Sequence, residues 1–264
     1  MAKADFNFPL GRNPGSYSVY KMRGVERLII RAKAGPSKKQ IATAPQFAFM
    51  RQNMSEFGGA GKISGLLLDA CYGIKHLADA NFTGNLSKAC RLIMEKDSSV
   101  AGSRSILLSK YGNLLEGFSM NKENQFDSVV KQSPTVTFSR VSCKASLEFP
   151  VLYPGVNLFG HWQLPYYRFI IVMGLVPDMI STLKGYTAVN PLMTFNPVQV
   201  RTDWFSAAEE IGSVIREIEL ATGTLIDASG SLVVSIGIEF GRNLSNRIIE
   251  AVRFAGCGKI LAVG

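Results

Sequence analysis

The apolar residues of this 264-residue chain change their spacing part-way along. Between about residues 44 and 94 they recur at three- and four-residue steps, the period of an α-helix with one buried face. After about residue 130 they form short runs of β-branched and aromatic residues, broken by Gly, Pro and Asn, which is typical of strands. We therefore expect an α+β fold in which a helical region precedes a β-rich one.

Three helices are predicted in the first region. One begins near Thr43 and ends at the Gly58-Gly59 pair, because paired glycines disfavour a continuing helix. A second covers Gly61 to Ala80, and a third begins at the cap residue Asn85. Together they suggest a small bundle. The expected buried positions are Phe47, Met50, Met54 and Phe57 in the first helix, Ile63, Leu66, Leu67, Ala70, Cys71, Ile74 and Leu77 in the second, and Leu86, Ala89, Cys90, Ile93 and Met94 in the third.

Two extended segments precede these helices. Residues 1–15 contain two prolines and two glycines and predict an extended arm, which Phe6, Phe8 and Leu10 could dock in a groove of this chain or of a neighbour. The runs at residues 16–21 and 25–31 favour β-structure and are separated by three residues, the spacing of a tight hairpin. The predicted hairpin has one apolar side and one partly basic side.

The β-rich region predicts an antiparallel sandwich or a barrel-like domain. A polar stretch between residues 121 and 134 separates it from the helices, which gives three parts: an arm at 1–15, a hairpin and helical domain at 16–128, and a β-rich domain at 129–264. Residues 213–220 also fit a continuing helix, so this segment has two interpretations. The seven candidate strands are Thr135 to Val141, Lys144 to Phe149, Tyr166 to Met173, Val198 to Phe205, Ser213 to Leu220, Ser231 to Phe240 and Lys259 to Val263.

Positive charge is concentrated near the N-terminus. Residues 1–128 hold 18 Lys and Arg against 10 Asp and Glu, whereas residues 129–264 hold 11 against 10. Such a cluster favours an anionic partner, either a nucleic acid or an acidic protein surface, and it could equally be a solvated face. The candidate contact residues are Lys21, Arg23, Arg27, Arg31, Lys33, Lys38 and Lys39.

The motifs that would indicate an enzyme are missing. The glycines before Lys62 lack the spacing of a phosphate-binding loop, and no G-x-S-x-G motif is present. The only histidines, His76 and His161, lie far apart, and the carboxylate pair Glu209-Glu210 is typical of a solvated surface. The sequence predicts no catalytic residue, no cofactor and no metal site.

The four cysteines, Cys71, Cys90, Cys143 and Cys257, lie far apart and predict free thiols. The first residues lack the apolar core of a secretory signal, and the longest apolar run is about half of the roughly 20 residues that a membrane span needs. We therefore expect a cytoplasmic protein, or part of a particle assembled in the cytoplasm, without membrane contact.

The order of features in residues 11–60 resembles the N-terminal region of uncharacterised proteins common in Bacteroidota. The similarity consists of a G-S-Y-S-V-Y-K-M-R-G hairpin, an I-I-R-A-K-A-G-P-S-K segment, and a helix with Phe47 and Arg51. It covers about a quarter of the chain and implies a bacterial origin, and it implies no catalytic residue.

These features lead to one main functional hypothesis and two alternatives. The arm, the uneven charge and a C-terminal strand candidate at the last residues favour a structural protein that self-associates, such as a subunit of a filament or of a virion-like or tail-like particle. The first alternative is a nucleic-acid-binding protein that uses the basic residues at 21–39. The second is an enzyme whose residues converge only in three dimensions.

Overall fold

The computed structural model describes residues 17–22, 25–32, 35–160, 162–191, 196–220, 226–245 and 248–264. The chain divides into two compact units, residues 1–51 and residues 52–264. The boundary expected between residues 121 and 134 lies inside the second unit, because the helices there share a hydrophobic core with the largest sheet.

The first unit begins with the predicted hairpin. Strands β1 (Tyr17–Lys21) and β2 (Leu28–Ala32) pair antiparallel, in a register that places Val19 opposite Ile30. Helix α1 (Lys38–Thr43) follows, and a capping box between Ser37 and Gln40 closes its first turn. A short 3-10 helix, η2 (Pro45–Phe47), then leads into α2.

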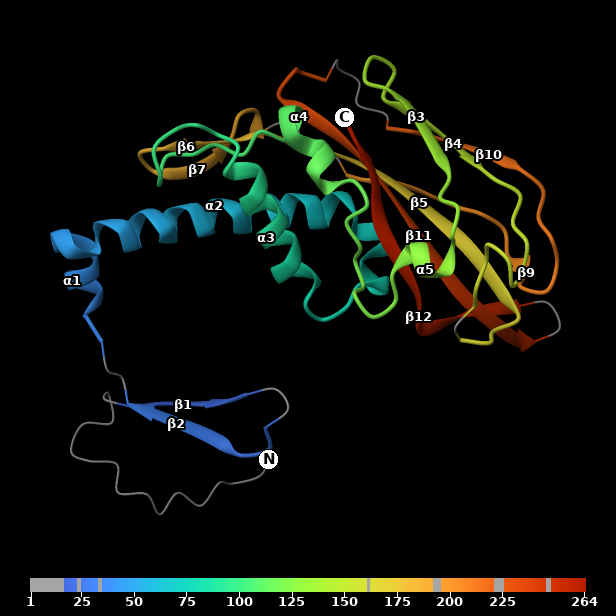
Figure 1. The fold of residues 1–264 in the computed structure, drawn as a ribbon, viewed down its shortest axis with the longest axis horizontal. Helices are drawn as coiled ribbons and strands as arrows, with labels where there is room; N and C mark the ends of the chain where they lie inside the picture. Colours follow the sequence, from blue (N-terminus) through green and yellow to red (C-terminus); the bar gives the residue numbers. More distant parts are fainter. Residues whose placement is uncertain are drawn as a thin grey trace. The chain divides into compact units, whose positions relative to one another are not determined.

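The second unit has three layers (Figure 1). Its central layer is an antiparallel sheet in the order β12-β11-β5-β8, with β9 also paired to β5, and a smaller sheet in the order β10-β4-β3 covers one face. The helices cover the other face. The strands are β3 (Thr135–Ser139), β4 (Lys144–Phe149), β5 (Tyr166–Pro177), β6 (Met179–Thr182), β7 (Gly185–Ala188), β8 (Val198–Arg201), β9 (Phe205–Ser206), β10 (Val214–Glu219), β11 (Gly230–Ser245) and β12 (Ile248–Val263).

Strand β5 shows how one sequence supplies two cores. Successive side chains of a strand point to opposite faces. Ile170 and Val172 accordingly pack against the helices, while Phe169 and Ile171 pack toward the smaller sheet. A continuous apolar run is thus required, because both faces of the central sheet are covered. This arrangement confirms the α+β class and the antiparallel β-rich C-terminal region.

Helix α2 (Ala48–Ala70) runs through Gly58 and Gly59, so the predicted end of the first helix there was wrong. The reason is tertiary packing. A Cβ atom added to Gly59 would lie 2.6 Å from Cγ of Tyr186, so the glycine allows the ring to lie directly against the helix backbone. Packing of this kind routinely overrides the low helix propensity of glycine.

The predicted buried stripe of the first helix was also wrong. Met50, Met54 and Phe57 are exposed, by 67% in the case of Phe57. The buried face of α2 instead includes the carboxylate of Glu56, which accepts a hydrogen bond from the Gly102 backbone N–H at 2.7 Å. The buried residues of α2 are Glu56, Gly59, Ala60, Ile63, Ser64, Leu67 and Ala70.

The next helical segments largely follow the prediction. The chain continues from α2 into a 3-10 helix, η3 (Tyr72–Leu77), and then into α3 (Phe82–Met94), which begins three residues before the expected cap. The expected positions are buried except Leu66 and Ala89, which are partly buried against the same core. Three short elements complete this layer: α4 (Leu108–Tyr111), η4 (Gly112–Leu115) and α5 (Phe126–Val129).

The strand predictions were confirmed for β3, β4 and β10, and the strand at Val214–Glu219 excludes the helical interpretation of this segment. Strands β5, β11 and β12 are longer than expected, and β6 and β7 were not predicted. The C-terminus is held by pairing, since the backbones of Leu232 and Gly264 exchange two hydrogen bonds. None of the described helices combines the length and hydropathy that crossing a bilayer requires.

Candidate functional site

The predicted basic residues that the structure describes lie on the hairpin and on α1. Lys21 is on β1, Arg31 is on β2, and Arg27 immediately precedes β2, while Lys38 and Lys39 form the first turn of α1. All five are exposed. None of them forms an ion pair within the described part of the chain. Arg23, Lys33 and the proposed arm-docking residues Phe6, Phe8 and Leu10 lie outside the described residues.

The described part of the first unit has no hydrophobic core. Not one of its described residues up to Arg51 is buried, although the hairpin and the start of α2 are rich in apolar side chains. The exposed apolar residues are Val19, Tyr20, Met22, Val25, Leu28, Phe49 and Met50. An isolated two-stranded hairpin is marginally stable in water. This unit therefore lacks the burial that normally stabilises such a structure.

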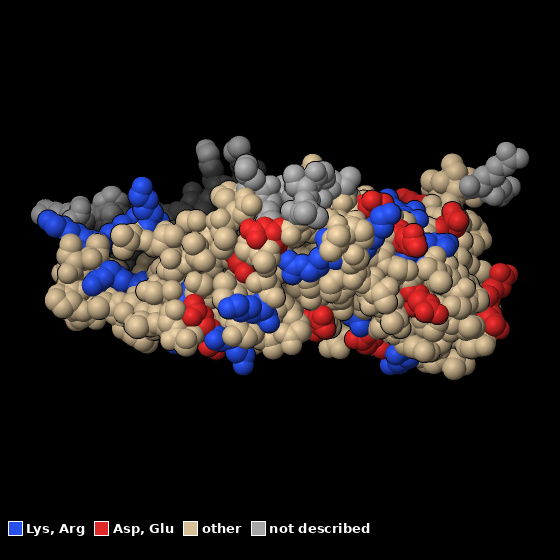
Figure 2. All heavy atoms as spheres, turned by 90° about the horizontal axis from the view of Figure 1, so that it is seen from above, with Lys and Arg blue, Asp and Glu red and all other residues tan. Residues whose placement is uncertain are grey.

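An acidic face lies on the outer side of the smaller sheet. Glu148 on β4 and Glu217 and Glu219 on β10 point away from the core, since the alternate residues of both strands are buried or partly buried. Lys144 forms an ion pair with Glu219 at 3.0 Å and also interacts electrostatically with Glu217, so this face has three carboxylates for one such lysine. Figure 2 shows several Asp and Glu side chains, with Lys and Arg side chains among them, at the right of the view, on the side where these strands lie in Figure 1.

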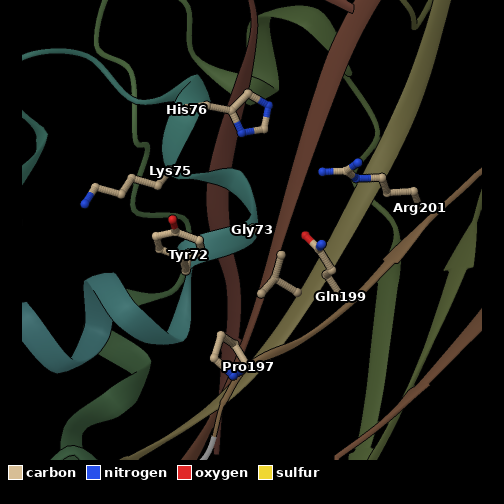
Figure 3. Close-up of a pocket in the computed structure, with 8 residues that line it drawn as sticks. Tyr72, Gly73, Lys75, His76, Pro197, Gln199 and Arg201 are labelled. Atoms are coloured by element: carbon tan, nitrogen blue, oxygen red, sulfur yellow. The ribbon is translucent and has the colours of Figure 1, made fainter.

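A polar groove lies on the helix side of the central sheet. It encloses about 610 Å³ between η3 and the edge strand β8. The helices stop short of this edge, so the side chains of Gln199 and Arg201 on β8 remain exposed. Figure 3 shows both side chains pointing toward η3, and the amino group of Lys75 pointing away from them. The lining residues are Tyr72, Gly73, Lys75, His76, Val172, Pro197, Gln199 and Arg201.

A buried carboxylate organises one end of the groove. Glu239 on β11 accepts a hydrogen bond from His76 Nε2 at 2.9 Å and forms a two-point contact with the guanidinium of Arg168 at 2.5 Å. Burial acts to raise the pKa of Glu239, but the hydrogen bonds from His76 and Arg168 outweigh it and hold the pKa below its usual value. Because an ionised carboxylate can only accept, Nε2 of His76 carries a proton, and the ring orientation is fixed.

Two further contacts shape the groove. The guanidinium of Arg168 lies 4.4 Å from the ring centroid of Trp204, a cation–π contact that holds it in place. A Cβ atom added to Gly73 would lie 2.5 Å from Oε1 of Gln199 and 2.8 Å from Cγ2 of Val172. Glycine at position 73 therefore keeps this part of the groove open.

The cysteines, which are the other groups that could be reactive, lie in the protein interior. The four cysteines are buried, and burial raises the pKa of the Cys71 and Cys90 thiols to about 12. Within the described residues, no three His, Cys, Asp or Glu side chains are grouped closely enough to hold a metal ion. His161, the second histidine considered from the sequence, lies outside the described residues.

Comparisons of this chain with protein-family models, with curated proteins and with solved structures gave no match. Function must therefore be argued from the surfaces and the groove.

Sequence reasoning identified the basic residues but missed the groove. Its lining residues come from η3, β5 and the segment that contains β8, which are distant along the chain, and the register of the sheet brings β5 and β8 together. One signal was available: Gln199 and Arg201 alternate with Val198 and Val200, as expected for a strand with one uncovered face. That pattern could have indicated a polar surface at β8, but not its partners.

Proposed function

We propose that this protein is a structural subunit that self-associates, and that the first unit of one copy docks on a second copy. The observation that carries the proposal is the first unit itself, whose described residues include seven exposed large apolar side chains and no buried residue. Ordering a backbone costs about 1–2 kcal/mol per residue, which burial normally offsets. A second copy would supply that burial.

Charge complementarity favours a second copy as the partner. Residues 1–51 contain ten Lys and Arg against two Asp and Glu, and residues 52–264 contain 19 against 18. The acidic face of Glu148, Glu217 and Glu219 offers the opposite charge, beside a hollow of about 270 Å³ lined by Thr137, Phe138 and Glu217 among others. Complementary surfaces of this kind steer association and fix its register.

The geometry of such a contact bears on the form of the assembly. The docking unit and the acidic face are different surfaces, so the contact is heterologous. Heterologous contacts produce rings when the rotation closes and filaments when it does not. The proposal thus covers a filament or a ring-like particle built from one chain.

Light scattering after size-exclusion chromatography tests the proposal by charge reversal. We expect the wild-type chain to form oligomers, and Arg27→Glu with Arg31→Glu to shift them to monomer. Glu148→Lys with Glu217→Lys should do the same, and the four changes together should restore assembly because the charges are exchanged. Asp69→Lys with Glu123→Lys is the matched control on other surfaces and should assemble normally. A wild-type chain that remains monomeric at high concentration would contradict the proposal.

A second candidate is nucleic-acid binding by the hairpin. One observation favours it: the pairing of Tyr20 with Ile29 and of Ser18 with Arg31 places an aromatic ring and a guanidinium on the same face of the hairpin. Aromatic stacking beside phosphate contacts is the usual means of binding single strands. If this function holds, affinity for a fluorescent single-stranded oligonucleotide falls steeply with salt, and Arg27→Ala with Arg31→Ala reduces that slope by about 2.

A further inference from the structure

The polar groove has the features of a ligand-binding site, and this property does not depend on self-association. Two of its lining residues, Lys75 and Arg201, are cationic, and none is a carboxylate. Among the described residues, Glu239 is the only carboxylate that contacts a lining residue, which is His76. One carboxylate oxygen of Glu239 contacts Arg168 and the other contacts His76. The guanidinium of Arg201 has no hydrogen bond or ion pair within the described part of the chain, so its fork is available to a ligand.

The groove also has the size and the mixed lining of a small-molecule site. Ligand pockets commonly enclose about 300–1,000 Å³ and combine apolar walls with a few convergent polar groups. Here Pro197 forms an apolar part, the ring of Tyr72 is exposed at the rim, and the Gln199 amide lies beside the guanidinium of Arg201 (Figure 3).

The polar end of the groove is held in place before any ligand arrives. Glu239 is nearly fully buried and fixes both His76 and Arg168, and Trp204 stacks on Arg168. Preorganised groups of this kind lower the entropic cost of binding. A buried charge network at one end of an otherwise open hollow is characteristic of a binding site with a defined orientation for its ligand.

We propose that the polar groove binds a small organic molecule that carries an oxyanion, either a carboxylate or a phosphate ester. Arg201 contacts the oxyanion through its planar fork, which matches both groups with two parallel hydrogen bonds. Gln199 donates a further hydrogen bond from its side-chain amide, and Tyr72 and Pro197 contact the apolar part of the ligand.

Isothermal titration of the full chain with three probes tests this inference: inorganic phosphate, phenyl phosphate and benzoate. We expect phenyl phosphate or benzoate to bind at one site per chain, more tightly than inorganic phosphate because the ring adds apolar contact. Tighter binding of phenyl phosphate assigns the site to phosphate esters, and tighter binding of benzoate assigns it to carboxylates. Failure of all three probes to bind at about 10 mM overturns the proposal.

Matched variants locate the binding. Arg201→Gln should weaken the better probe about tenfold, since hydrogen bonds to charged groups are the stronger ones, and Gln199→Ala should weaken it less. Arg242→Gln changes an exposed arginine on β11 outside the groove and should bind as the wild type does. All three positions are exposed, so thermal unfolding should remain unchanged. Wild-type affinity in Arg201→Gln would show that the anion binds elsewhere and would sink the assignment.

Discussion

The two units of this chain differ in how far they bury their apolar side chains. The second unit covers both faces of its central sheet and has two hydrophobic cores, one under the helices and one under the smaller sheet. The first unit has regular secondary structure with good capping and register, yet none of its described residues is buried. Local structure alone is thus no measure of stability, and in our proposal the first unit is the part that a second copy stabilises.

The largest expected effect follows from placing charge on the apolar side of the hairpin. Val19 and Leu28 share that side, since Val19 pairs with Ile30 and Leu28 with Lys21. Val19→Asp with Leu28→Asp should abolish oligomer formation in light scattering. The main thermal transition should be unaffected because the second unit has its own cores. Oligomers that persist in this variant would show that the hairpin is not the docking element.

A pair of changes on α2 compares buried and exposed apolar residues on one helix. Ile63 is fully buried and Phe57 is 67% exposed. Ile63→Ala should lower the free energy of unfolding by about 2–5 kcal/mol, as large-to-small changes in a core do. Phe57→Ala should change it by less than about 0.5 kcal/mol. Chemical denaturation measures both, and equal effects would mean that Phe57 is covered.

Acid should weaken the second unit through Glu239. Its pKa is lower in the folded state than its ordinary value of 4.5, so the carboxylate contributes stability above that value. This contribution is lost as the pH falls through the lowered folded pKa. Glu239→Gln should cost about 3 kcal/mol at pH 7, because it leaves Arg168 without its buried partner. It should also flatten the pH dependence of unfolding below about pH 4.5.

The smallest expected effect is the chemical modification of cysteine thiols in the folded chain. Burial raises the pKa of Cys71, Cys90 and Cys257 to about 12, so almost no thiolate forms at neutral pH. We expect iodoacetamide at pH 7.5 to leave all three unmodified in the folded chain, as measured by intact mass spectrometry, and to label them in denaturant. Rapid labelling of the native chain would show that the cores open readily.

The spacing of apolar residues predicted those parts of the fold that depend on a single helix or strand with one buried face. The strands at Lys144–Phe149 and Val214–Glu219 and the buried faces around Leu67 and Leu86 followed from spacing alone. The spacing failed where residues that are distant in the sequence determine whether a segment is helical or buried. Gly59 remains helical because Tyr186, 127 positions away, packs on it. The apolar stripe of Met54 and Phe57 is exposed because the opposite face of α2 contacts the sheet.

The basic cluster and the polar groove differ in the same respect, since one is local in sequence and the other is not. The basic cluster is local in sequence, so counting charges predicted it. The polar groove depends on the register between β5 and β8, which pairs Ile170 with Arg201 and Val172 with Gln199. Register of this kind cannot be read from one strand. The self-association, the anionic partner and the lack of catalysis remain predictions.

The central claim is that a second copy stabilises the first unit. Hydrogen–deuterium exchange at a series of protein concentrations tests it most directly, because the backbone amides of β1–β2 and of β5–β11 are measured in the same sample. We predict that protection of the β1–β2 amides rises with protein concentration, while protection of the β5 and β11 amides stays constant and high. Protection of β1–β2 that is the same at the lowest and highest concentrations would contradict the claim.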